Sequence, residues 1–385
     1  MDRRNFIGVG SALAASTIPL YSFGNGLYDR AYQSENNEVD FIYDGVKLDP
    51  QEYTKLITKL VDEGKVKPDY YSNGGVVEEL ENKFAALLGK ESAVYMPTGT
   101  LANHIAVRKL AQENRRIVVQ EQGHLYNDSG DCVQTLSNLN LIPLGLNEVS
   151  FTLEEVKQLQ DKTKSGRVET KIGVIVIESP VRRKNDRVVE YDRIKEISDY
   201  AKNNDIKMHL DGARLFVQAV HAKLDPKEFA SHFDTVYTSL YKCFNAPSGA
   251  ILAGSKEFTS NLYHERRMFG GGQSSVWPFA AIALYYADGF MTEYKHAWTN
   301  AEAMFSILEK QEGFEVVRFE NGSHIVGLNV KTKNLPGFRD ALKKQKINLE
   351  KADGSGFLLK INPTINRINP NELANRFIEA LNTTG

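Results

Sequence analysis

The stretch IKMHLDGARLF, residues 206–216, determines the architecture that we expect for this chain. Its apolar half ends in Asp211, and a second apolar run, DTVYTSL at 234–240, ends near Lys242. Such runs are typical of buried strands in a parallel sheet, and the chain between them leaves room for one crossover helix over 213–221. Ligands bind at the carboxyl ends of the strands in open α/β sheets. We therefore predict that Asp211 and Lys242 share a site.

These two residue types suit one kind of cofactor. A half-desolvated lysine loses its proton more readily and can form a Schiff base with an aldehyde. Pyridoxal 5'-phosphate (PLP) bound in this way needs an acid at its ring nitrogen, so that the ring accepts electrons. Lys242 and Asp211 fit these two roles. Taken singly, each has a plainer interpretation, because an aspartate often caps a helix and a lysine often lies at the surface.

A third segment, YMPTGTLANH at 95–104, favours the cofactor interpretation. We predict a short strand over 92–96 that breaks at Pro97, a turn at Thr98, Gly99 and Thr100, and a helix from Leu101. Backbone N–H groups at a helix start, flanked by hydroxyl groups, form a cradle for phosphate. Without a partner, the same turn would be an ordinary helix N-cap.

Together these segments resemble the threonine aldolase / β-eliminating lyase family of PLP-dependent enzymes of fold type I. HLDGAR at 209–214 is specific to that family, whereas TGT alone is not. The resemblance covers roughly residues 40–288, and the other matching stretches follow in the family's order: EQGH (121–124), IES (177–179), the segment 239–249 and RRMFGGG (266–272).

The resemblance implies the following roles. Lys242 would carry the cofactor, Asp211 would hold the pyridinium charge, and His124 would stack on the ring and act as acid or base. The phosphate would be bound by Thr98, Gly99 and Thr100. The substrate would be bound by Arg214, through its carboxylate, and by Glu178 and Tyr43. As plainer alternatives, Arg214 would form an ion pair on a helix surface, and a lone loop histidine usually has no such role.

The sequence departs from the family around the substrate. Threonine aldolases usually carry Thr-His and Gly-Gly where this chain has PVRRKND at 180–186. An Arg-Ser-Asp-Thr pattern is replaced by Tyr43-Asp44-Gly45, so we expect Tyr43 to replace a serine. Near the last strand the family's Arg and Thr-His are absent, and Lys360 and Arg367 are the candidates to substitute for them. The basic residues at 182–184 could meet an acidic substrate, although such a cluster is more often a solvated loop.

Composition excludes several function classes. A net charge of −2 over 385 residues provides no electrostatic basis for binding nucleic acid or an anionic membrane. Two cysteines, Cys132 and Cys243, make no disulfide framework, and we predict no metal site. The resemblance implies an α/β fold of the PLP-dependent transferase type, with a mostly parallel central sheet and a smaller α+β domain.

The predicted domain boundaries follow changes in sequence character. Residues 1–38 are interpreted as an export signal and linker, because Arg3-Arg4 precedes an apolar run at 8–20 that is too short to span a membrane. The predicted location is therefore the periplasm or another exported one by the twin-arginine route, and the cytoplasm if the signal does not function. Residues 39–290 form the large PLP-binding domain, of which 39–65 could pack with the small domain at 291–385. Within the large domain we predict a helix over 256–268.

The function predicted from the sequence is cleavage of a β-hydroxy amino acid to glycine and an aldehyde. The alternatives are a β-eliminating lyase or aminotransferase acting on another amino acid, and an exported PLP-binding protein without turnover. The expected partner is a small amino acid substrate, with no nucleic acid and no membrane after signal removal. A homodimer or homotetramer with shared active sites is implied by the resemblance.

Overall fold

The computed structural model describes residues 37–384. The twin-arginine pattern and most of the segment predicted as an export signal and linker lie outside the described residues. Within 37–384, no helix combines the length and the apolar character that a bilayer crossing would require.

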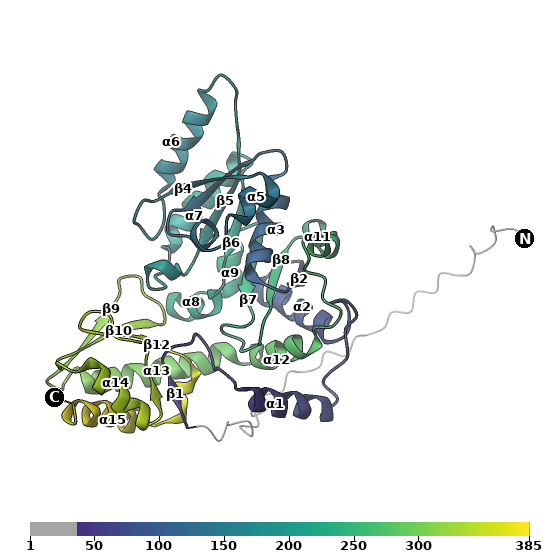
Figure 1. The fold of residues 1–385 in the computed structure, drawn as a ribbon. Helices are drawn as coiled ribbons and strands as arrows, with labels where there is room; N and C mark the ends of the chain where they lie inside the picture. The colour runs from purple at the N-terminus through teal and green to yellow at the C-terminus, as the bar shows by residue number, and fades with distance from the viewer. Residues whose placement is uncertain (1–36, 385) are drawn as a thin grey trace, which may run out of the picture. The chain divides into compact units, whose positions relative to one another are not determined.

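A seven-stranded sheet in the order β2-β8-β7-β6-β5-β3-β4 forms the centre of the molecule (Figure 1). Strands β4, β3, β5, β6 and β7 pair in parallel, and β8 is antiparallel to both of its neighbours. All seven residues of β5 are buried, as expected for a parallel strand covered on both faces. The strands are β2 (Ser92–Met96), β3 (Arg116–Gln120), β4 (Asn140–Leu144), β5 (Ile172–Glu178), β6 (Lys207–Asp211), β7 (Thr235–Ser239) and β8 (Ala250–Gly254). The predicted α/β class with a mostly parallel sheet is confirmed.

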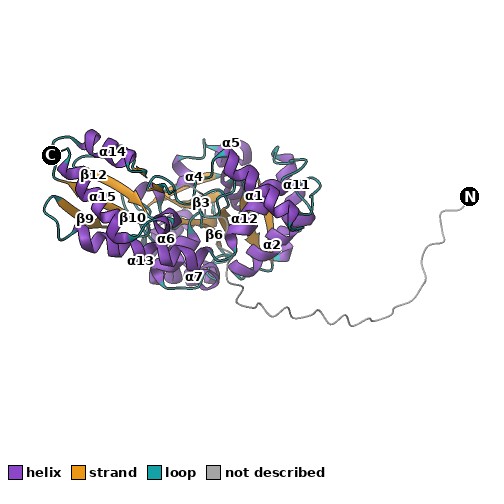
Figure 2. Ribbon diagram, turned by 90° about the horizontal axis from the view of Figure 1, so that it is seen from below, coloured by secondary structure: helices purple, strands orange, loops and turns teal. Residues whose placement is uncertain are grey.

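Helices cover the sheet on two sides; α5 and α7 lie on opposite sides of the strands in Figure 2. The starts of α1 and α6 are encoded locally, since Asp49 with Glu52 and Thr152 with Glu155 form capping boxes. The helices in this part are α1 (Pro50–Asp62), α2 (Gly75–Leu88), α3 (Gly99–Ala111), α4 (His124–Asn127), α5 (Cys132–Ser137), α6 (Leu153–Lys164), α7 (Tyr191–Asn203), α8 (Leu215–Ala222), α9 (Pro226–Ala230), α10 (Lys256–Thr259), α11 (Leu262–Met268) and α12 (Trp277–Ala287), with a 3-10 turn, η2 (Arg182–Lys184).

A second, three-stranded sheet in the order β12-β10-β9 lies with the C-terminal helices (Figure 1). Its elements are β9 (Phe314–Arg318), β10 (Ile325–Val330), β12 (Gly356–Lys360), α13 (Phe290–Leu308), α14 (Leu335–Lys344), α15 (Pro370–Asn382) and the 3-10 turn η3 (Pro363–Arg367). The N-terminal strand β1 (Val39–Asp40) pairs in parallel with β11 (Ile347–Asn348), and Val39 and Phe41 belong to the C-terminal hydrophobic core. Residues 37–384 belong to one compact unit, so the boundary at residue 290 stays a prediction.

Three predicted boundaries differ from the structure. The strand expected to end near Lys242 ends at Ser239, and Lys242 lies on the turn that follows. The helix expected from Leu101 begins at Gly99 with Thr98 as its N-cap. The single helix expected over 256–268 is divided into α10 and α11 around Ser260 and Asn261.

Candidate active site

A cavity of about 240 Å³ opens at the carboxyl ends of β5, β6 and β7. Glu178 is the last residue of β5, Asp211 is the last residue of β6, and Lys242 follows β7. The parallel strands thus bring to one edge three side chains that are far apart in sequence. The cavity is lined by Pro97, Thr98, Gly99, Thr100, His124, Glu178, Arg182, Asp211, Ala213, Arg214, Tyr237, Tyr241, Lys242 and Ser248.

A chain of buried hydrogen bonds holds the Asp211 carboxylate. Asn103 Nδ2 donates to Asp211 Oδ2 over 2.6 Å, and Asn103 Oδ1 lies 2.8 Å from His209 Nε2. Because Asn103 Oδ1 only accepts, His209 carries its proton on Nε2, and its Nδ1 accepts from the Thr235 hydroxyl at 2.8 Å. Burial lowers the pKa of His209 to about 4, so the imidazole is neutral. Asn103 thus presents an amide N–H to Asp211 and fixes its orientation.

Lys242 is placed against the cavity by the turn after β7. Burial and the nearby Arg214 guanidinium lower the pKa of its amine, which favours the nucleophilic form. Gly45 packs directly on this turn, because a Cβ at that position would lie 2.3 Å from the Lys242 carbonyl oxygen. Asn245, in the same turn, accepts from the backbone N–H of Val46 at 2.8 Å. The segment 44–46 therefore supports the turn that carries Lys242.

The start of α3 forms one wall of the cavity. The Thr98 hydroxyl caps the helix by accepting from the Leu101 N–H at 3.2 Å. Gly99 is required by packing, since a Cβ there would lie 2.1 Å from the Tyr237 hydroxyl oxygen. With the N–H groups at the helix start and two threonine hydroxyls, this wall can accept an anion such as phosphate.

His124 and Glu178 lie together on another wall. The Glu178 carboxyl accepts from the backbone N–H of His124 at 2.6 Å and from that of Arg182 at 3.0 Å. Burial, with a smaller contribution from Asp211, raises the pKa of Glu178 to about 8. Glu178 therefore retains a proton near neutral pH and orders the loops that present His124 and Arg182 to the cavity.

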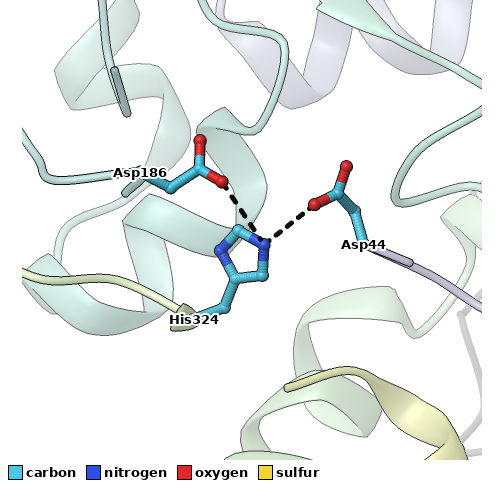
Figure 3. Close-up of side chains that lie close together, drawn as sticks. All are labelled: Asp44, Asp186 and His324. Carbon is cyan, nitrogen blue, oxygen red and sulfur yellow. Dashed lines mark hydrogen bonds and ion pairs between the residues drawn. The ribbon is translucent and has the colours of Figure 1, made fainter. Parts of the chain in front are cut away.

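Arg214 lies within a buried cluster of charges that sequence reasoning missed. Its guanidinium is 2.9 Å from Asp44 and 3.4 Å from Asp186, and the Arg214 side chain is 5% exposed. His324 Nε2 lies between the two carboxylates, 2.9 Å from Asp44 and 3.8 Å from Asp186 (Figure 3). We do not assign a cation to this group, because the Arg214 guanidinium already lies against both carboxylates.

Asn185 and Asp186 both have positive φ angles, 56° and 50°. This left-handed backbone conformation is one that glycine favours. The buried Asp186 side chain places its carboxylate 3.4 Å from the Arg214 guanidinium. The departure from the family at 180–186 therefore has a structural consequence. A substrate carboxylate that binds Arg214 would have to compete with the carboxylates of Asp44 and Asp186.

Tyr43 does not line the cavity; the residue is 38% exposed and its hydroxyl accepts from Lys47 Nζ at 2.6 Å. The neighbouring Asp44, which carried no prediction, is the residue of that segment that reaches Arg214. Lys360 and Arg367 also lie outside the set that lines the cavity. The motif alone did not show whether Tyr43 or Asp44 points towards the cavity wall. The folded chain shows that Asp44 does, because its carboxylate contacts Arg214.

The residues present fit PLP. No lysine or arginine in the described part of the chain lies within ion-pair distance of Asp211, which is only 3% exposed. A buried carboxylate without a cationic partner is costly, and the N–H of a protonated pyridine would compensate it. Lys242 would bind the aldehyde group and the start of α3 the phosphate. PLP, once bound there, supplies an electron sink for bonds at the substrate's Cα.

Comparison with known proteins identifies the family. The family model "Beta-eliminating lyase" matches residues 63–331. The chain belongs to this family. It is 30% identical over 250 residues to a protein of Schizosaccharomyces pombe named "Probable low-specificity L-threonine aldolase", covering 64% of each chain. It is 28% identical to the low-specificity L-threonine aldolase of Candida albicans, covering 57% of this chain and 58% of the relative. The matched stretches thus span less than two thirds of these two relatives.

Solved structures confirm the fold. A structure of Leishmania major threonine aldolase aligns with a TM-score of 0.67 at 15% identity, over 90% of this chain and 99% of that one. A structure of "SPT with PLP internal aldimine" aligns with a TM-score of 0.62 at 16% identity, over 90% of this chain and 87% of that one. At these identities the likeness concerns the fold alone.

Proposed function

We propose that this chain is a PLP-dependent lyase that cleaves a β-hydroxy amino acid into glycine and an aldehyde. One observation carries the proposal: Lys242, an amine of lowered pKa, lines the same cavity as Asp211, a buried carboxylate for which residues 37–384 supply no ion-pair partner. The names of the relatives, low-specificity L-threonine aldolases, support the same reaction.

In this proposal the chain's own residues bind, orient and move protons. Asp211 would stabilise the positive charge of the protonated ring nitrogen, and Asn103 orients the Asp211 carboxylate by donating a hydrogen bond to it. His124, fixed through its backbone N–H by Glu178, is the group that we expect to accept the proton of the β-hydroxyl. Breaking of the Cα–Cβ bond then leaves the aldehyde, and a proton returned to Cα completes glycine.

The test separates aldol cleavage from elimination. We would incubate the PLP-loaded protein with L-allo-threonine and with serine, and measure glycine and acetaldehyde against pyruvate and ammonia. We expect glycine and acetaldehyde in equal amounts, and their loss in Lys242→Ala. Pyruvate and ammonia as the main products would favour the β-eliminating alternative, and the absence of turnover on any amino acid would favour a binding protein.

Two further proposals concern the whole protein. We propose export by the twin-arginine route, supported by Arg3-Arg4 and the apolar run that follows. A fusion of residues 1–38 to a reporter protein would test this proposal, and a reporter that stays in the cytoplasm would contradict it.

We also propose a homo-oligomer with shared active sites, supported by the family resemblance. Light scattering of the PLP-loaded protein tests this, and a monomer would contradict it.

A further inference from the structure

Two tyrosines line the cavity, and they differ in how much of the side chain a ligand can reach. Tyr237 is only 3% exposed, and its hydroxyl packs against Gly99 at the start of α3. Tyr241, in contrast, is 49% exposed. Of the large hydrophobic residues that are exposed within 37–384, Tyr241 alone lines the cavity. It therefore offers an aromatic surface to a ligand in the cavity.

The Tyr241 ring lies beside the reactive amine. Lys242 Nζ stands over the ring, 5.5 Å from the ring centroid. The amino group of a substrate has to approach this amine closely in order to replace it on the cofactor. The β-carbon of the substrate lies two bonds from that amino group, about 2.5 Å away. A substituent on the β-carbon can therefore reach contact distance from the ring, about 4 Å between heavy atoms.

The turn that carries Lys242 is held by residues other than Tyr241. The Tyr53 hydroxyl donates to the Asn245 carbonyl oxygen at 2.9 Å, and Asn245 Oδ1 accepts from the Val46 N–H at 2.8 Å. Burial raises the pKa of the Tyr241 hydroxyl, so the side chain is neutral, and within 37–384 no hydrogen bond holds that hydroxyl. The ring thus has no visible task in supporting the turn.

A second side chain that suits a planar ligand lies close to Tyr241. Arg182 also lines the cavity, and its side chain is 46% exposed. It is near enough for its charge to act on the Tyr241 hydroxyl, although burial has the larger effect on the pKa of that group. A guanidinium stacks on an aromatic face, whereas a methyl group gives it little contact. Both side chains therefore favour an aryl group over a small aliphatic one.

We propose that Tyr241 is a specificity-determining residue whose ring packs against an aromatic substituent on the β-carbon of the substrate. The inference rests on the proposed function, because it concerns which β-hydroxy amino acid the same cavity accepts. The substrate class is that of β-hydroxy amino acids with an aryl group on the β-carbon. Their cleavage between Cα and Cβ gives glycine and an aromatic aldehyde.

The test measures ligand binding to the full-length PLP-loaded protein, so it needs no carbon–carbon cleavage. The probes are L-phenylalanine, which carries an aryl group on its β-carbon, and glycine, which has no β-carbon; the cofactor's absorbance reports binding. We expect Tyr241→Ala to weaken phenylalanine binding about 5–30-fold, because an aromatic pair and buried apolar area are both lost. Glycine binding should change less than about twofold. Tyr241→Phe keeps the ring and should bind both ligands as the wild type does.

The matched control is Tyr263→Ala, at a position outside the cavity. Tyr263 is 38% exposed, and the Arg266 guanidinium lies 5.4 Å from its ring centroid. Both affinities should keep their wild-type values in this variant. Equal weakening of both ligands in Tyr241→Ala would overturn the proposal, because the residue would then only position Lys242. So would unchanged phenylalanine binding in Tyr241→Ala, or a Tyr241→Phe variant that binds phenylalanine as weakly as Tyr241→Ala.

A cleavage assay separates this inference from the proposed reaction. We would compare L-allo-threonine with a β-hydroxy amino acid that carries a phenyl group on its β-carbon. Tyr241→Ala should raise KM about 5–30-fold for the phenyl substrate and less than about twofold for L-allo-threonine. If the wild type cleaves neither substrate but the affinities change as expected, the proposed reaction fails and the binding role of Tyr241 stands. If both are cleaved and Tyr241→Ala leaves the ratio of the two KM values unchanged, the reaction stands and this inference fails.

Discussion

At the residue scale, Glu178 makes the stability of the protein depend on pH. Its pKa is raised to about 8 by burial, so the folded state keeps a proton that the unfolded state releases above about pH 4.5. The contribution of this bound proton to the free energy of unfolding is therefore complete below about pH 4.5, and it is lost as the pH rises towards 8. We expect the free energy of unfolding of the wild type to fall relative to Glu178→Gln by about 1 kcal/mol per pH unit in this window. Urea unfolding of the cofactor-free protein from pH 5 to 8 measures this difference in the free energy of unfolding.

The control is Glu320→Gln, at an exposed position. If the plots of unfolding free energy against pH for the wild type and Glu178→Gln stay parallel, the raised pKa assigned to Glu178 is contradicted.

Asn103 provides a second prediction at this scale. Asn103→Ala removes a donor to Asp211 and an acceptor for His209, both buried. We expect a loss of stability of about 2–3 kcal/mol and at least about tenfold weaker PLP binding, because Asp211 loses its fixed orientation. The matched control is Asn362→Ala, which removes an equally buried amide bonded to the Asp40 and Tyr43 carbonyls. Both variants should lose stability in urea, but only Asn103→Ala should weaken PLP binding; equal PLP affinities would count against the role of Asn103.

Sequence reasoning predicted cavity residues that belong to local motifs, and it missed the buried charge cluster behind Arg214, which is assembled from distant segments. Thr98, His124, Asp211 and Lys242 lie within short recognisable segments, and all of them line the cavity. Asp44, Asp186 and His324 come from three distant segments with no shared pattern, so their meeting depends on tertiary packing. Tyr43 was predicted at the substrate because register alone cannot indicate which of two adjacent residues faces inward.

At the scale of elements, the segment 44–46 supports the turn that carries Lys242. Gly45→Ala would place a Cβ 2.3 Å from both the Lys242 carbonyl oxygen and Asn245 Oδ1. Because backbone has to move, we expect a destabilisation of about 1–3 kcal/mol together with weaker PLP binding. The control is Gly166→Ala, where the nearest atom would be 3.2 Å away on the exposed loop after α6. Unchanged PLP absorbance and affinity in Gly45→Ala would show that the turn does not depend on this contact.

Secondary structure was predictable where apolar periodicity and caps agree. β2 was predicted with the bounds that it has, 92–96, because apolar residues run without interruption up to Pro97. The helix over 256–268 was wrong as a single element, since Ser255 caps a short α10 and the chain restarts at α11 after Asn261. Sequence periodicity does not register such a break, because both short helices keep apolar residues on the side that packs on the sheet.

At the scale of the whole molecule, the N-terminal segment connects the C-terminal core to the cavity. Phe41 is buried against Phe377, with ring centroids 6.0 Å apart, and its backbone bonds to Asn348 and Lys360. Three residues later Asp44 pairs with Arg214 at the cavity wall. Because a short, fully anchored stretch joins the two regions, a defect in the C-terminal core should reach the cofactor site through it.

The corresponding experiment compares Phe41→Ala with Phe338→Ala, since Phe338 is buried in the same core but lies outside the N-terminal segment. Each variant should lose about 3–5 kcal/mol in urea unfolding, the usual cost of truncating a buried phenylalanine. Only Phe41→Ala should also weaken PLP binding under native conditions, because only there does the anchor of Asp44 loosen. Equal PLP affinities in the two variants would mean that the pairing of Asp44 with Arg214 holds the segment in place without Phe41. Coupling between the two sheets would then run through α13, whose Tyr294 hydroxyl is bonded to His221 Nε2 of α8 at 2.7 Å.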